Sequence, residues 1–173
     1  MSDRLERFPA SGDARGLNAN HQVRAVRDGR SIVRIAADRV VPVPHLLIEI
    51  RREYSQAQEV ALIDAVDGAL HRAFRIPPND RHVRLLAHEP HRFACPPDTA
   101  LPDLYTQVSV DAFAGRSIET KRALYREIVE SLEPLGIPRD HVSILVRDHP
   151  LTDWGIRGGK AACDVDLGFD VNV

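Results

Sequence analysis

The chain has 173 residues, 43% hydrophobic and 28% charged, with a net charge of −2, which is the balance of a single globular domain. The charge gives no sign of a nucleic-acid or membrane surface, and no apolar run approaches the roughly 18 residues of a membrane span. The two cysteines form neither a disulfide framework nor a metal-binding spacing, and the N-terminus lacks the apolar core of a secretory signal. We therefore expect a cytoplasmic protein that binds neither nucleic acid nor membrane.

Charge is divided unevenly on the two sides of Pro44. Residues 1–43 contain eight arginines, no lysine and five acidic residues, a net charge of +3, whereas residues 44–173 carry −5. We expect residues 1–43 to be an N-terminal extension that is either disordered or adds one strand over 31–41, where β-forming side chains gather. Residues 44–173 are expected to form the folded domain.

A short apolar strand is predicted over residues 44–52. Proline has no N–H to give to a sheet, so Pro44 suits the first position of this strand. Ser55, followed three residues later by Gln58, forms a capping-box pattern that predicts a helix. Apolar residues at helical spacing continue to Phe74, after which two prolines end the helix.

A strand predicted over 83–87 completes the first half, and a proline-rich loop over 88–103 follows it. The second half shows the same order of elements and begins with a strand predicted over 104–113. Ser117 is a plausible N-cap of a second helix that ends before Gly136, and a last core strand is predicted over 142–146.

The two halves are a repeat, covering about residues 44–90 and 104–150. Ser55 and Ser117 lie 62 positions apart, and Asp80-Arg81-His82-Val83 corresponds to Asp140-His141-Val142. Each half is a β-α-β unit, whose crossover returns a parallel strand. The expected fold class is α/β (α+β): a four-stranded sheet with both helices on one face. The other face is left bare, which leads us to expect a homo-oligomer.

These features resemble the tautomerase superfamily. A proline-led strand, the repeated β-α-β unit and Gly115-Arg116-Ser117 at the start of the second helix carry the resemblance, together with Asp153-Trp154-Gly155-Ile156-Arg157-Gly158-Gly159. The similarity extends from Pro44 to about Ala162 and is greatest to the two-repeat branch that contains malonate semialdehyde decarboxylase. It implies trimers of two-repeat chains, hence a homotrimer here. We expect no cofactor or metal, because fixed hydrogen-bond donors can stabilise an enolate.

The resemblance also implies roles for four residues. Pro44 matches the N-terminal catalytic proline, and Asp80 matches an aspartate that activates or positions a water or the substrate. Arg116 matches an arginine that binds the substrate carboxylate, and His71 falls where related cis-specific dehalogenases have a carboxylate-binding histidine. A second arginine, present just before this position in both branches, is replaced here by Phe113 and Ala114. No counterpart of the dehalogenases' water-activating glutamate is found, so dehalogenation is not expected.

Residue chemistry agrees with the family roles and also leaves structural alternatives open. Arg116 at a helix start adds guanidinium donors to backbone N–H groups that already favour anions. Asp80 equally suits a turn residue that bonds to its own backbone. His71 equally suits a partly buried structural histidine, and Trp154 suits packing. The expected function is a tautomerase-like enzyme acting on a small 2-oxo or enol carboxylate, with an inactive or small-molecule-binding oligomer as the alternative.

The choice between these functions depends on the nitrogen of Pro44. As a chain terminus it would be a secondary amine with a pKa near the α-amino range of about 7.7–8.0, able to exchange a proton at neutral pH. Inside the chain it is an amide without basicity. Val43 directly precedes Pro44, and a valine codon of the GTG type can initiate bacterial translation. One hypothesis is therefore that the native protein begins at Pro44.

Overall fold

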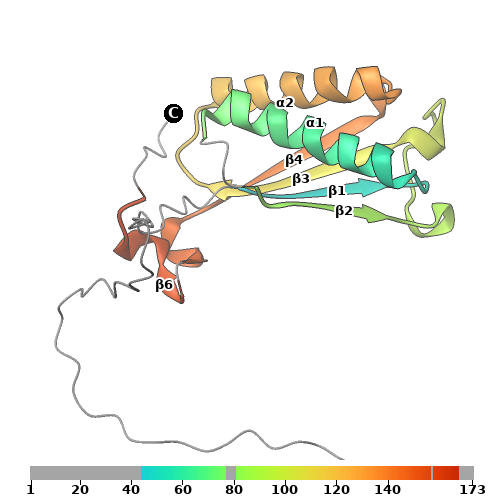
Figure 1. Ribbon diagram of the computed structural model, residues 1–173. Helices are drawn as coiled ribbons and strands as arrows, with labels where there is room; N and C mark the ends of the chain where they lie inside the picture. Colours follow the sequence, from blue (N-terminus) through green and yellow to red (C-terminus); the bar gives the residue numbers. More distant parts are fainter. Residues whose placement is uncertain (1–43, 77–80, 157, 168–173) are drawn as a thin grey trace, which may run out of the picture. The chain divides into compact units, whose positions relative to one another are not determined.

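The computed structural model describes residues 44–76, 81–156 and 158–167. The expected extension 1–43 with its strand over 31–41, and the candidate residue Asp80, lie outside this description. Four strands form the main sheet: β1 (His45–Ile50), β2 (Val83–Ala87), β3 (Thr106–Phe113) and β4 (Val142–His149). Their order is β2-β1-β3-β4, with β1 and β3 antiparallel in the centre and each outer strand parallel to its neighbour (Figure 1). This is the expected pair of β-α-β units.

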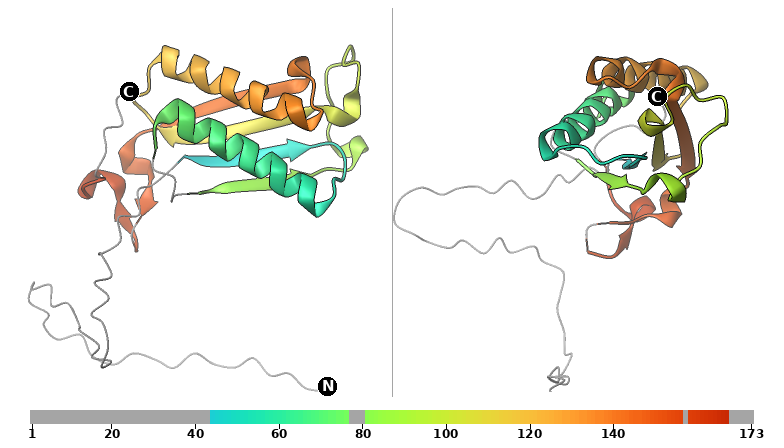
Figure 2. Two further views of the ribbon diagram at one scale, coloured as in Figure 1. Left: turned by 45° about the horizontal axis from the view of Figure 1, so that its top comes forward. Right: turned by 90° about the vertical axis from the view of Figure 1, so that its right-hand side faces the viewer.

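Both long helices, α1 (Gln56–Phe74) and α2 (Ile118–Leu132), lie on one face of the sheet (Figures 1 and 2). The capping box at α1 is confirmed, because the Ser55 side chain accepts from the Gln58 backbone and the Gln58 side chain accepts from the Ser55 backbone. Ser117 caps α2 by accepting from the Thr120 backbone N–H. The start of each helix thus follows from local sequence.

The core lies between the helices and the sheet. Alternate side chains of the two central strands point toward the helices and are fully buried, as Leu46, Ile48 and Val108 illustrate. They meet one stripe of each helix, which supplies Leu62, Val66, Ala69, Leu70, Leu124, Ile128 and Leu132. One contiguous apolar cluster therefore holds the two repeats together.

The opposite face of the sheet carries polar pairs and exposed leucines. Glu49 lies 3.0 Å from His88, and Asp111 lies 2.9 Å from His149, each between a carboxylate oxygen and Nε2. Leu86 and Leu145 are both 47% exposed on the outer strands. No helix of the described residues covers this face, as was expected from the repeat.

Element ends differ in detail from the sequence-based boundaries. The strand expected over 104–113 begins at Thr106, since Pro102–Leu104 forms a 3-10 turn, and the strand expected over 142–146 continues to His149. The loop over 88–103 contains a second 3-10 turn, Pro90–Arg92. The other 3-10 turns are Glu133–Leu135, Arg139–His141, Leu151–Asp153 and Ala162–Asp164. No helix in the described ranges has the length and apolar character needed to cross a membrane.

The segment after β4 forms a small hairpin of β5 (Gly155–Ile156) and β6 (Lys160–Ala161). The tight connection uses Gly158 and Gly159 at positive φ of 79° and 94°, which side chains with a Cβ rarely adopt. The segment has its own apolar cluster, in which Trp154 and Leu167 pack with Phe113 at the end of β3. The C-terminal segment thereby covers one end of the uncovered sheet face.

Candidate functional site

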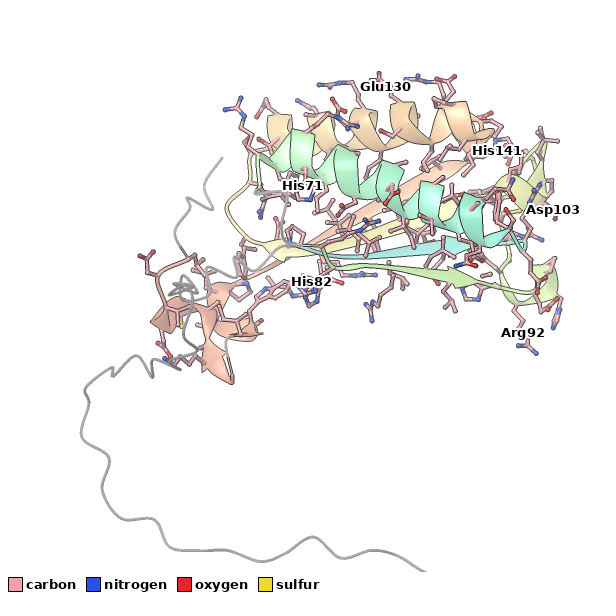
Figure 3. The ribbon with its side chains drawn as sticks, viewed as in Figure 1. His71, His82, Arg92, Asp103, Glu130 and His141 are labelled. Carbon is pink, nitrogen blue, oxygen red and sulfur yellow. The ribbon has the colours of Figure 1, made fainter. Side chains whose placement is uncertain are left out.

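Four segments of the chain meet at the end of the sheet where β1 begins. The Leu46 N–H donates to the His82 carbonyl at 2.8 Å, so the start of β2 lies beside the start of β1. His45 is in register with Asp111, which brings the end of β3 to the same place, and Phe113 is in register with His149 of β4. In Figure 3, His71 and His82 lie at this end, whereas Arg92, Asp103 and His141 lie at the other.

Pro44 directly precedes β1 at this end and is buried. Its position fits the expected use of proline as the residue that opens a strand. In the 173-residue chain its nitrogen belongs to a peptide bond and therefore has no basic lone pair. Only a chain that begins at this residue would present an amine here.

Arg116 lies in the turn between β3 and α2 and is only 6% exposed. Its Nη1 donates to the Phe113 carbonyl at 2.7 Å, and its guanidinium carbon lies 4.3 Å from the centre of the Phe74 ring. Burial lowers the pKa of the Arg116 guanidinium, while Asp148 opposes that shift. Its buried Nε has no hydrogen-bond partner among the described residues. A buried guanidinium with an unsatisfied N–H group can bind an anionic ligand by donating a hydrogen bond to it.

His71 lies in the last turns of α1. Its Nδ1 donates to the Ile76 carbonyl at 3.2 Å, which ties the histidine to the end of its own helix. Its Nε2 lies 3.6 Å from Oδ2 of Asp67, one helical turn earlier, and makes no hydrogen bond within the described ranges. The side chain thus has a structural contact on one nitrogen, while the other nitrogen is buried beside Asp67.

A pocket of about 330 Å³ opens beside the start of β1 and β2. It is lined by His45, Arg81, His82, Val83 and Arg84. Arg81 forms ion pairs with Asp64 and with Asp67, the latter at 3.6 Å. Among the described residues the lining contains two arginines and no acidic side chain, so this part of the lining is positive.

Aromatic side chains pack beside this pocket. The Trp154 ring lies 5.0 Å from the rings of both His45 and Phe113, and 5.9 Å from that of His149, measured between ring centres. The His45 and His82 rings are 4.9 Å apart. The buried Trp154 Nε1 has no hydrogen-bond partner in the part of the chain that the structure describes. Trp154 packs as expected and in addition borders the candidate site.

Pro44, Arg116 and His71 all come to the same end of the fold, while Asp80 lies outside the described residues. His45, His82 and Arg84 were not singled out from the sequence. A signal existed, because His45 and Arg84 occupy positions of their strands that point away from the apolar core. His82 directly precedes β2, and its backbone carbonyl accepts a hydrogen bond from β1.

Comparison with known proteins agrees with this geometry. A family model described as "Tautomerase enzyme" matches residues 80–157. A solved malonate semialdehyde decarboxylase, designated FG41 and inhibited by 3-bromopropiolate, is 33% identical, with a TM-score of 0.62 over 68% of this chain and 92% of that one. The chain belongs to the tautomerase family.

Two further structures place this family member among two-repeat relatives. A malonate semialdehyde decarboxylase studied for its decarboxylase and hydratase activities is 28% identical, with a TM-score of 0.63 over 71% of this chain and all of that one. Native fused 4-OT is 26% identical, with a TM-score of 0.64 over 70% and 98% of the two chains. The recognised superfamily and its two-repeat architecture are confirmed.

Proposed function

We propose that the protein is a tautomerase-like enzyme that moves a proton on a small 2-oxo or enol carboxylate, using the amine of Pro44. The observation that carries the proposal is the position of Pro44. This residue is buried and directly precedes β1, at the same end of the sheet as Arg116 and the positive pocket. The structures of the 28%-identical decarboxylase include a variant in which its first residue, a proline, is replaced by alanine. Pro44 corresponds to that proline by the family resemblance.

The surroundings of Pro44 suit an amine that works near neutral pH. Burial and a nearby cation both disfavour the protonated form and so lower the pKa of an amine. A terminal amine starts near 7.7–8.0, and a modest lowering places its pKa close to the pH at which it must both take and give a proton. Arg116 supplies the cation, since its guanidinium stays charged despite burial.

Arg116 is proposed to stabilise the enolate oxygen that develops during proton transfer. Its Nε–H is a buried donor without a partner in the described part of the chain, and leaving such a donor unsatisfied costs about 1–3 kcal/mol unless a ligand oxygen accepts from it. A fixed donor of this kind stabilises an oxyanion without reorganisation and without a metal or cofactor. Asp80 is proposed to position the substrate or a water, and His71 to contact a substrate carboxylate, as the family resemblance implies.

The alternative function is a small-molecule-binding oligomer without catalysis. It is favoured by one observation, the peptide bond that blocks the Pro44 nitrogen in the 173-residue chain. Both functions share the pocket and the fold. They differ in whether residues 1–43 precede Pro44 in the mature protein.

We propose a homotrimer as the assembly. The uncovered sheet face with its exposed leucines needs a partner surface, and in a closed ring of three copies each chain can cover part of this face on its neighbour. One of the 26%-identical fused 4-OT structures is a symmetric trimer.

The test of the enzymatic proposal compares two forms of the protein: the 173-residue chain, verified intact by mass, and a chain that begins at Pro44. Each is assayed for conversion of phenylenolpyruvate to its keto form. The form with the free proline amine is expected to turn over, and the longer form is expected to be inactive. Equal rates would show that amine catalysis is wrong, while binding without turnover in both forms would favour the alternative.

A further inference from the structure

We infer that Asp67, on α1, is a positioning residue that holds His71 as a doubly protonated imidazolium at the candidate active end. The His71 ring then carries a positive charge, and Asp67 acts on a substrate only through this ring. The inference rests on the proposed function for the identity of the ligand as an anionic substrate. The charge of the His71 ring itself does not depend on catalysis.

The first argument is the distribution of hydrogens on the His71 ring. The Ile76 carbonyl oxygen, 3.2 Å from Nδ1, can only accept a hydrogen bond, so Nδ1 carries a hydrogen. In a neutral ring, Nε2 would have a lone pair that faces a carboxylate oxygen of Asp67 at 3.6 Å, with no hydrogen between the two acceptors. A hydrogen on Nε2 turns this repulsion into an attraction between opposite charges. It belongs to the ring rather than to the carboxyl group, because imidazole is ordinarily the stronger base.

The second argument is the balance of charge around Asp67. Its Oδ2 lies 3.6 Å both from Nε2 of His71 and from Nε of Arg81, the residue two positions before β2. Arg81 also forms an ion pair with Asp64 of α1. If His71 were neutral, two carboxylates would share one guanidinium, whereas a charged ring makes this group of four side chains neutral. Since the Asp67 and His71 side chains are only 14% and 16% exposed, an unbalanced charge between them would be costly.

The third argument is the position of the two side chains along α1. His71 lies in the last turn of the helix, where the unpaired backbone carbonyls favour a positive charge. The helix runs toward the candidate active end, where Phe74 stacks on Arg116. The His71 ring therefore lies about one helical turn nearer to that end than the Asp67 carboxylate. An anionic ligand at this end is attracted by the ring more strongly than the carboxylate repels it.

The fourth argument comes from the second repeat. Leu70 of α1 and Leu132 of α2 are both buried and lie 62 positions apart, the same spacing as the two helix caps. At this spacing Asp67 corresponds to Val129, an aliphatic residue. Packing therefore does not require a carboxylate here, and the buried Oδ1 of Asp67 has no hydrogen-bond partner in the described ranges. The effect of Asp67 on His71 gives this acidic residue a role.

The test reads the protonation of the ring directly in the intact 173-residue chain. The ring ¹⁵N signals of the histidines are recorded at pH 7.5, where an ordinary exposed histidine is mostly neutral, and those of His71 are assigned with His71→Gln. Both ring nitrogens of His71 are expected to be protonated, whereas the exposed His91 is expected to show a neutral ring in the same spectrum. An unprotonated nitrogen in the His71 ring would overturn the inference.

Substitutions then assign the charge to Asp67. Asp67→Val, which copies the second repeat, and Asp67→Asn, which keeps the size of the side chain, are each expected to give a neutral ring with its hydrogen on Nδ1. The matched control is Glu59→Gln, which removes an equal charge from the first turn of the same helix and is expected to leave the His71 ring protonated. A protonated ring in both Asp67 variants, or a neutral ring in the control, would overturn the inference.

Kinetics of the chain that begins at Pro44 distinguish this inference from the proposed function. Asp67→Val is expected to raise KM for an enol carboxylate at least about threefold and to change kcat less, because the active end loses a positive charge that attracts the substrate. Glu59→Gln is expected to leave KM within about twofold. An unchanged KM in Asp67→Val would overturn the positioning role. An inactive parent would refute the proposed function, and the ring signals of His71 would still decide the inference.

Discussion

The guanidinium of Arg116 stacks on the ring of Phe74, with 4.3 Å between its central carbon and the ring centre. The two residues come from different repeats, because Phe74 ends α1 and Arg116 precedes α2. A contact between a cation and an aromatic face contributes about 0.5–2 kcal/mol, toward the upper end when water is excluded. The pair thus fixes the candidate oxyanion donor and joins the two helices at the proposed active end.

The stacking predicts measurable coupling between the two side chains. Phe74→Leu and Arg116→Met are each expected to lower the free energy of unfolding, and the double variant to lower it by about 0.5–2 kcal/mol less than the sum. Urea denaturation of the four proteins measures this. Strict additivity would show that the observed proximity contributes no stability.

The same arginine predicts a catalytic effect. In the chain that begins at Pro44, Arg116→Ala is expected to reduce kcat/KM for an enol carboxylate by a factor equivalent to about 2–4 kcal/mol, as for removal of an oxyanion donor. The Phe74→Leu protein is the control for loss of packing, because it keeps the guanidinium. If kcat/KM of Arg116→Ala stayed within twofold of the parent, the guanidinium would contribute to stability and not to catalysis.

Most of the fold was predictable because its determinants are local. The capping box at Ser55, the N-cap at Ser117 and the apolar periods of the helices specify each β-α-β unit before any tertiary contact forms. The extension of β4 to His149 was not predictable. Its last residues, from Arg147 onward, are polar, and pairing with β3 rather than β-propensity keeps them in the sheet.

The site was predictable only in part. Pro44 and Arg116 stand out by their positions at the starts of a strand and a helix. The direction of the Arg116 side chain depends on a long-range contact with Phe74, and a sequence does not reveal such contacts. The pocket at His45 and Arg84 arises where two strand starts meet, which requires the strand register to be known.

A buried histidine predicts an acid-sensitive contribution to stability. His141 is 3% exposed, its Nε2 accepts from the Leu101 N–H at 2.9 Å, and its Nδ1 therefore donates to Asp140 at 2.7 Å. This hydrogen bond holds the pKa of the Asp140 carboxyl below its ordinary value. The stabilisation is present above the ordinary aspartate range and is lost as the pH falls through the lowered pKa.

Asp140→Asn is accordingly expected to be less stable than the parent at pH 7, with the difference shrinking in acid. Thermal denaturation between pH 7 and pH 2.5 measures it. Asp98→Asn, at an exposed aspartate with no ion pair in the described part of the chain, serves as the control. A stability difference for Asp140→Asn that stays constant over this range would contradict the assigned hydrogen bond.

Helix α1 is expected to depend on its cap. Ser55→Ala removes an acceptor for the Gln58 backbone N–H and should lower the free energy of unfolding by about 0.5–2 kcal/mol. Gln56→Ala, at the exposed first helical residue, should change it by less than about 0.5 kcal/mol. Urea denaturation distinguishes the two, and equal effects would show that the cap contributes nothing.

The uncovered sheet face predicts the assembly. Light scattering is expected to give three times the 19.3 kDa of one chain, and Leu145→Asp on this face to give monomers, because it would place a charge in an apolar interface. Ile118→Asp, at a similarly exposed apolar residue on α2, is the control and should leave the trimer intact. A stable parent monomer at micromolar concentration would exclude the proposed trimer.

The two β-α-β units are related by an approximate twofold axis between the antiparallel strands β1 and β3, so each end of the sheet has a counterpart. His82, beside the pocket, corresponds to His141, which is buried and bonded on both ring nitrogens. The residue directly before β3, which is equivalent to Pro44, is not a proline and follows the turn Pro102–Leu104. The duplicated halves therefore differ at equivalent positions: one histidine is bonded within the buried interior, and the other lines a pocket where a ligand can reach it.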